Sequence, residues 1–164
     1  MIKLDKEIPK EELKRIYELA GSTFITANRL EYSLKYLIWL LTELGFIDFN
    51  KEEALNIMEN KSKKTIGSLI KTLKRYIKVS DDFDEILLSG LDTRNNFIHN
   101  YFMDNPELLI SENGRKTMIS DIKAMRKVLY STVKSLDKYI SPLMKMSIII
   151  EAGDRIENNK IIWY

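Results

Sequence analysis

The chain has 164 residues, a length that suits one domain with a single sizeable core. Hydrophobic residues make up 45% of it and charged residues 30%, as in ordinary globular proteins, and the formal net charge is +2. Because the chain has no cysteine, disulfides, thiolate metal sites and cysteine nucleophiles are all excluded.

The first predicted element is a helix that Pro9 can begin, because proline suits the first turn. Gly21 and Ser22 can interrupt it, with Ser22 or Thr23 capping a second helix that runs to about Leu44. The second helix has a wide apolar stripe, which is typical of a helical bundle.

Two shorter helices are predicted next, over residues 51–60 and 65–77. Ser80 then opens a longer helix, since a capping hydroxyl followed by two aspartates suits the positive end of the helix dipole. This helix is expected to run to about Phe102, where the sequence DNPE stops it.

One segment has a β pattern. Residues 108–119, LLISENGRKTMI, place Asn113 and Gly114 between two short apolar runs, and this pair is favoured in type I′ hairpin turns. Helical spacing returns afterwards, and Pro142 is expected to kink or end the last helix. The sequence therefore predicts an all-α, up-and-down bundle of four to five main helices with a small β-hairpin near 108–119.

Charge is concentrated in one block. Residues 61–78 contain seven basic side chains and no acidic one, and Lys71, Lys74 and Arg75 belong to this block. Such a block can follow a phosphate backbone, and the alternative is a solvated helix face.

The only histidine lies in LDTRNNFIHNYF, residues 91–102. The sequence has no multi-histidine or Cys/His metal spacing, no P-loop and no G-x-S-x-G motif, so we expect neither a metal site nor a cofactor. If the protein catalyses proton transfer near neutral pH, His99 is the natural acid–base group.

The spacing of this segment on a regular helix predicts how its polar side chains lie. At roughly 100° per residue, Arg94 and His99 fall about 140° apart, on opposite edges of an apolar stripe that includes Leu87 and Phe102. Asn95 lies four residues before His99, so the two side chains can meet.

One helix therefore presents Arg94 and His99 poorly as a pair, whereas two such helices packed across a two-fold axis would bring both to one cleft. Arg94 could then hold a phosphate bidentately. The sequence thus favours a homodimer. The alternative is that both side chains simply face solvent or stabilise the end of the helix.

A family resemblance adds to this interpretation. The stretch RNNFIHNY resembles the R-x4-H signature of the HEPN superfamily (higher eukaryotes and prokaryotes nucleotide-binding domains), including the asparagine directly after the arginine. The stretch TIGSLIKTLKR is similar to a TLG-x-L segment found upstream of the motif in many relatives. In coarse terms the resemblance covers residues 10–140.

The resemblance implies a metal-independent endoribonuclease that works as a homodimer and serves as a toxin or in defence against phage. By analogy Arg94 and His99 are catalytic, Asn95 positions them, and RNA is cut to leave a 2′,3′-cyclic phosphate. The basic block, with Lys71, Lys74 and Arg75 as its candidates, would then contact RNA.

Two further residues are candidates for supporting roles. In one branch of the superfamily the pattern is R-x4-H-x-Y, and a partner nucleotidyltransferase antitoxin adds AMP to the tyrosine; Tyr101 stands at that position and is otherwise a packing residue. Glu31 lies on the core-facing stripe of its helix, where a carboxylate is costly without a partner. It either orients Arg94 or His99 or forms a boundary salt bridge.

The superfamily also contains members with degraded motifs that bind only nucleotides or partner proteins. A catalytically silent HEPN-like nucleotide-binding or protein-interaction module is therefore the alternative, and a plain bundle with an accidental R-x4-H match is a third reading. The charged N-terminus and short apolar runs indicate neither a secretion signal nor a membrane span, so we expect a cytoplasmic protein with no membrane association.

Overall fold

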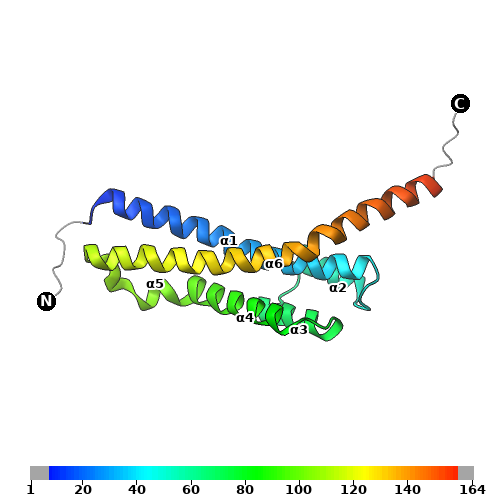
Figure 1. The fold of residues 1–164 in the computed structure, drawn as a ribbon, viewed down its shortest axis with the longest axis horizontal. Helices are drawn as coiled ribbons and strands as arrows, with labels where there is room; N and C mark the ends of the chain where they lie inside the picture. The colour runs from blue at the N-terminus through cyan, green and yellow to red at the C-terminus, as the bar shows by residue number, and fades with distance from the viewer. Residues whose placement is uncertain (1–7, 159–164) are drawn as a thin grey trace, which may run out of the picture. The chain divides into compact units, whose positions relative to one another are not determined.

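A computed structural model describes residues 8–158 (Figure 1). Its helices are α1 (Lys10–Glu43), α2 (Lys51–Met58), α3 (Ile66–Tyr76), α4 (Asp81–Asn95), α5 (Tyr101–Asp104) and α6 (Glu112–Asn158). A π-helical turn, η1 (Asn96–Asn100), joins α4 to α5, and a 3-10 turn, η2 (Pro106–Leu109), precedes α6. No strand occurs in residues 8–158, so the all-α prediction is confirmed.

Polar side chains fix the starts of three helices. Asn50, Thr65 and Ser80 each accept a hydrogen bond from the backbone N–H three residues later, at 2.8, 3.3 and 3.3 Å. These bonds satisfy donors that have no partner inside the helix. The predicted helix start at Ser80 is confirmed.

Helix α1 runs without a break through Gly21, where the sequence allowed an interruption. The Ser22 and Thr23 hydroxyls do not cap a new helix; both donate back to the Leu19 carbonyl, at 2.9 and 2.8 Å. An exposed glycine inside a helix costs only about 0.5–1 kcal/mol. Burial of the apolar face of α1 outweighs that cost.

The predicted β-hairpin near 108–119 is wrong. Asn113 and Gly114 lie in the first turn of α6, and the Gly114 N–H donates to Ser111 Oγ at 3.1 Å, as at a helix N-cap. A side chain at Gly114 would collide with the backbone of Leu108, so this glycine allows a close approach of two segments. A type I′ turn would need positive φ, and among the described glycines only Gly45 has it.

The contacts divide the chain into two compact units. Within the described residues, unit 1 comprises 8–31 and 79–134, and unit 2 comprises 32–78 and 135–158. Helices α1 and α6 contribute to both. The first seven and last six residues of the predicted domain 1–164 lie outside the described residues.

Unit 1 is a helical bundle in which α1, the α4–η1–α5 segment and α6 lie alongside one another (Figure 1). Buried side chains from all three segments form a core cluster: Ile16, Phe97, Tyr101, Met118 and Ile122. The R-x4-H segment is thus anchored in the core at two points, Phe97 and Tyr101.

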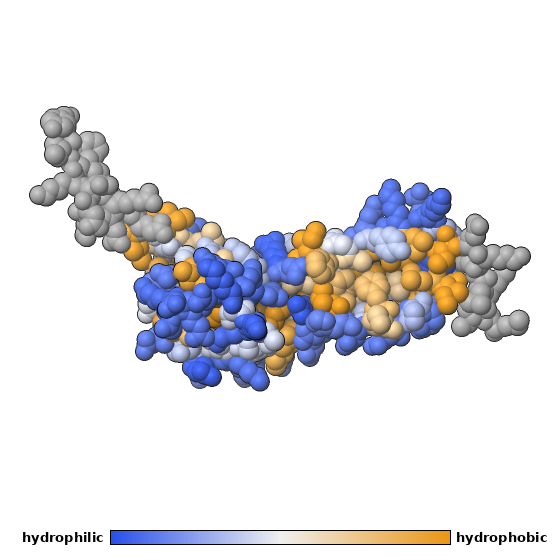
Figure 2. Space-filling model, turned by 180° about the vertical axis from the view of Figure 1, so that it is seen from behind, coloured by the Kyte–Doolittle hydropathy of each residue, from blue (hydrophilic) through white to orange (hydrophobic). Residues whose placement is uncertain are grey.

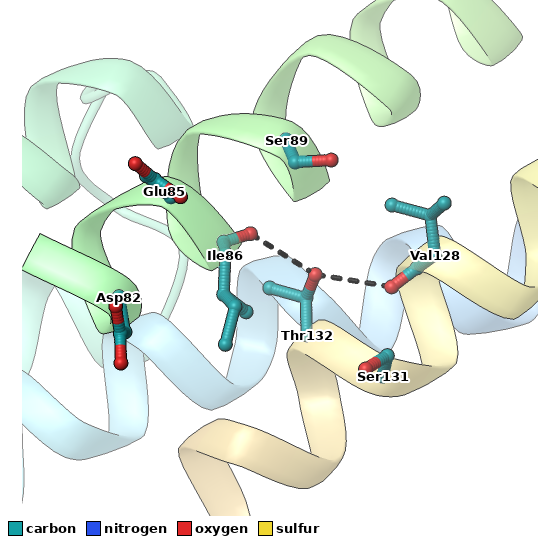
Figure 3. Close-up of a pocket in the computed structure, with 7 residues that line it drawn as sticks. All are labelled: Asp82, Glu85, Ile86, Ser89, Val128, Ser131 and Thr132. Carbon is teal, nitrogen blue, oxygen red and sulfur yellow. Dashed lines mark hydrogen bonds between the residues drawn. The ribbon is translucent and has the colours of Figure 1, made fainter.

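Helices α4 and α6 approach closely at Gly90, where an added Cβ would lie 2.6 Å from the Thr132 hydroxyl oxygen. The hydroxyl oxygen of Thr132 lies 3.2 Å from the Ile86 carbonyl oxygen and 3.1 Å from that of Val128 (Figure 3). Glycine at position 90 therefore lets a buried threonine join the two helices.

Unit 2 packs α2 and α3 with the second part of α1 and with the end of α6. Its buried apolar side chains include Leu34, Leu37, Ile38, Ile57, Leu69, Leu73 and Leu136. Helix α6 continues past Pro142 to Asn158, so proline does not end it. None of the helices in the described part of the chain is long and apolar enough to cross a membrane.

Candidate functional site: the Arg94–His99 pair

The motif is not carried by a regular α-helix. The backbone N–H of Tyr101 donates to the carbonyl of Asn96, five residues earlier, whereas an α-helix makes this bond between residues four apart. Residues 96–100 therefore form a π turn between α4 and α5. A continuous helix from Ser80 to Phe102, as the sequence predicts, misses this turn.

The wider turn brings Arg94 and His99 together. Arg94 Nη1 lies 3.2 Å from His99 Nε2 within one chain, where regular helical spacing would place the two side chains about 140° apart. A guanidinium can only donate, so Nε2 accepts and the ring proton of the neutral imidazole is on Nδ1. The geometric reason for requiring a second chain to unite these two residues therefore disappears.

Arg94 is held from two other sides. Its Nη2 lies 3.3 Å from Glu31 Oε2 on α1, and its Nη1 donates to Asn95 Oδ1 at 3.2 Å. The Arg94 side chain is 18% exposed and the Glu31 side chain 28%, so this ion pair is shielded from water more than a surface pair is. Asn95 thus supports Arg94, whereas the i, i+4 spacing pointed to His99.

The hydrogens of the guanidinium are largely committed in this arrangement. Both hydrogens of Nη1 have acceptors, in Asn95 and His99, and one hydrogen of Nη2 points to Glu31. Arg94 Nε is buried and has no hydrogen-bond partner in the described part of the chain. A phosphate must therefore displace an internal acceptor to be held by two parallel bonds from Arg94.

His99 itself is exposed, although its neighbours are anchored. Phe97 is 4% exposed and Tyr101 6%, so the core holds the chain on both sides of the histidine. Phe102, which the sequence placed on the apolar stripe, is 37% exposed. The extra residue in the π turn gives the core position to Tyr101.

The Tyr101 side chain faces α6. Its O–H donates to Asp121 Oδ2 at 2.9 Å. Burial of the ring, together with the hydrogen bond and the negative charge of Asp121, raises the pKa of Tyr101 well above its ordinary value. Tyr101 is therefore a packing residue with a satisfied phenol.

Asp121 is a residue that sequence reasoning missed. A signal for it exists, because Asp121 precedes the buried Ile122 and follows the buried Met118 by three positions, at the edge of the core stripe of α6. A carboxylate at such an edge is costly without a partner, which is the same reasoning that singled out Glu31.

The basic block is placed in unit 2, whereas the motif belongs to unit 1. Lys71, Lys74 and Arg75 are exposed on α3. Two other lysines of the block form ion pairs, Lys61 with Glu59 at 2.6 Å and Lys64 with Glu53 at 2.7 Å. Local carboxylates thus reduce the charge of the first part of the block.

A cavity of about 470 Å³ lies between α4 and α6 in unit 1 (Figure 3). It is lined by Asp82, Glu85, Ile86, Ser89, Val128, Ser131 and Thr132. Arg94 comes five residues after Ser89, roughly 140° further around the helix, so the cavity and the motif lie on different faces of α4. The carboxylates of Asp82 and Glu85 in its lining would repel a phosphate ligand.

No protein-family model, curated protein or solved structure matches the chain. Among the described residues, no group of three or more histidine, cysteine, aspartate or glutamate side chains is placed to hold a metal ion. The functional interpretation therefore depends on the geometry of the Arg94–His99 pair and on its sequence motif.

Proposed function

We propose that the protein is a metal-independent, HEPN-like endoribonuclease that acts as a homodimer, in a toxin or phage-defence role. The observation that carries the proposal is the 3.2 Å contact between Arg94 Nη1 and His99 Nε2. A cation for the phosphate and a base for the nucleophile are the two groups that cleavage by the 2′-hydroxyl needs side by side. Glu31 and Asn95 hold the cation in place.

In the proposed reaction the bound RNA first displaces one of the hydrogen-bond acceptors of Arg94. A phosphate oxygen replaces His99 Nε2 as the acceptor of a hydrogen bond from Arg94 Nη1. This frees the lone pair of Nε2. His99 then accepts the proton of the 2′-hydroxyl, O2′ attacks phosphorus, and the bond from phosphorus to O5′ breaks. The products are a 2′,3′-cyclic phosphate and a 5′-hydroxyl.

A protonated acid must deliver a proton to O5′, and each chain has a single histidine. A second chain would supply this acid as its own histidine, which is the remaining chemical reason for a homodimer. Apolar residues next to the motif support such an interface: Phe102 is 37% exposed and Met103 79%. The view in Figure 2 shows a broad apolar region over unit 1.

The remaining part of the proposal is the RNA contact. Lys71, Lys74 and Arg75 are exposed on one helix and are the candidates for binding the phosphate backbone.

One observation favours a second function. The Arg94 side chain is only 18% exposed, and its guanidinium is engaged by Glu31, Asn95 and His99. A site that keeps these contacts is a structural ion-pair network, and the protein would then be a catalytically silent nucleotide-binding or protein-interaction module.

The deciding experiment incubates the purified chain with RNA in the presence of EDTA and analyses the product ends. Cleavage to 2′,3′-cyclic phosphate ends is expected, with losses of at least about 100-fold in His99→Ala and Arg94→Ala. Arg15→Ala, an exposed arginine on α1, is the matched control and is expected to keep full activity. A strict requirement for a divalent ion, or activity that survives both motif changes, would refute the proposal. RNA left intact by wild type would favour the silent module.

A further inference from the structure

The π turn that unites Arg94 and His99 needs a source of stability. π turns are rare, because the α-helical i→i−4 pattern is the more favourable arrangement of the backbone. A turn of this kind persists where side-chain contacts favour it over the regular helix. The residue at the end of this turn makes such contacts.

Tyr101 stands at that end. Its backbone N–H closes the turn on the Asn96 carbonyl, and its own carbonyl accepts a hydrogen bond from the Asn105 side chain at 2.7 Å. The backbone of Tyr101 thus belongs both to the π turn and to the helix end that follows.

The side chain of Tyr101 is fixed just as firmly. It is 6% exposed and packs in the core cluster of unit 1, and its O–H donates to Asp121 Oδ2 at 2.9 Å. A hydrogen bond to a carboxylate is stronger than one between neutral groups. Return of residues 96–100 to an α-helix would rotate Tyr101 by roughly 100° and break this bond.

We propose that Tyr101 is a positioning residue: its hydrogen bond to Asp121 holds the π turn and, through the turn, the contact between His99 and Arg94. The catalytic meaning of this role rests on the proposed ribonuclease function, but the role itself does not. The phenol is already committed to Asp121 and the ring is buried, so attachment of a nucleotide to Tyr101 would require the turn to open.

The single histidine gives a direct spectroscopic test, because the 164-residue chain contributes one imidazole signal set. The 15N shifts of that ring distinguish the Nδ1–H tautomer, in which Nε2 accepts from Arg94, from a mixture of tautomers. Wild type is expected to show the Nδ1–H tautomer. Tyr101→Phe, which removes only the hydroxyl, is expected to shift the ring signals toward those of an unconstrained histidine.

Tyr130→Phe is the matched control, since Tyr130 is 58% exposed on α6, and it is expected to leave the imidazole spectrum unchanged. Asp121→Ala removes the acceptor at a half-buried position and should reproduce the effect of Tyr101→Phe if that variant fails to fold. A folded Tyr101→Phe or Asp121→Ala protein with the wild-type imidazole spectrum would overturn the proposal.

Cleavage of RNA provides the second readout. If wild type is active, Tyr101→Phe is expected to lower the cleavage rate about ten-fold, because a small displacement of catalytic groups costs up to 100-fold. If wild type does not cleave RNA, the ribonuclease proposal fails, while the imidazole spectrum still decides whether Tyr101 holds the turn.

Discussion

Glu31 contacts Arg94 Nη2 through a carboxylate oxygen at 3.3 Å, so a change at Glu31 can disturb the site without touching its reacting atoms. We expect Glu31→Ala to leave Arg94 poorly oriented and to lower RNA cleavage by roughly 10- to 100-fold. Glu31→Gln keeps an acceptor oxygen and should lose less. Single-turnover cleavage rates measure the effect.

The control for this prediction is Glu18→Ala, which removes an exposed carboxylate from the same helix. It is expected to cleave at the wild-type rate. Equal rates for wild type and Glu31→Ala would mean that Asn95 and His99 alone are enough to hold the guanidinium.

Tyr101 gives a pH-dependent contribution to stability. Its pKa in the folded protein is raised above the ordinary value of 10.0, because burial and Asp121 oppose ionisation. The unfolded chain loses this proton more readily, so the stabilisation is fully present below about pH 10 and is lost as the pH rises further.

Urea unfolding of wild type and Tyr101→Phe as a function of pH measures this contribution. We expect wild type to be more stable by about 1–2 kcal/mol at neutral pH, and the difference to shrink above pH 10. A difference that stays constant to pH 11 would mean that the phenol ionises alike in the folded and unfolded chains.

Residue patterns identified the members of the site but not their contacts. Sequence reasoning singled out Arg94, Asn95, His99 and Glu31, and the structure places all four side chains together. Sequence reasoning predicted a contact between Asn95 and His99 because it assumed α-helical spacing. It did not find Asp121. A partner that is distant in sequence is fixed by helix packing, which no local spacing encodes.

Helix positions could be predicted better than the irregularities of those helices. Ser80 begins its helix as expected, because a cap depends on residues only three apart. The π turn at 96–100 uses the same residue types as an α-helix and is selected by core contacts of Phe97 and Tyr101. Its existence could not be read from a periodicity that it interrupts.

The false hairpin has a similar cause. Asn113 and Gly114 suit a type I′ turn, but Ser111 also suits a helix N-cap three residues before Gly114. The helix forms instead of the turn because a helix that begins at this cap buries Arg115 and Met118 on one face of α6. Two local signals competed here, and packing decided between them.

Replacement of glycine by alanine is expected to have opposite effects on stability at two positions. Gly114→Ala would drive a methyl group into the Leu108 backbone and should destabilise the protein by about 1–3 kcal/mol. Gly21→Ala has no heavy atom within 4 Å of its new Cβ and should stabilise α1 by about 0.5–1 kcal/mol. Chemical denaturation compares both variants with wild type. Stabilisation by Gly114→Ala would contradict the close approach.

The homodimer remains a prediction. The site inside one chain already unites Arg94 and His99, so the argument for a second chain now rests on the need for another histidine and on exposed apolar side chains beside the motif. Residue spacing separated Arg94 from His99 only on a regular α-helix, and the π turn replaces that helix here.

We expect the chain to sediment as a dimer at micromolar concentration and Met103→Glu to weaken association at least about ten-fold, since a charge in an apolar interface is costly. Ile148→Glu, at a residue of unit 2 that is 63% exposed, is the matched control and should leave the dimer intact. A wild-type monomer in analytical ultracentrifugation would refute the dimer.

The π turn also has a consequence for insertions and deletions. It accommodates one residue more than an α-helix would between the core contacts of Phe97 and Tyr101. Loss of Asn100 would leave those two aromatic rings three residues apart, a spacing that an ordinary helix also buries. The core would then survive while His99 rotated away from Arg94. The presence of one residue in the turn, whatever its side chain, thus keeps Arg94 and His99 together, in addition to the hydrogen bond between Tyr101 and Asp121.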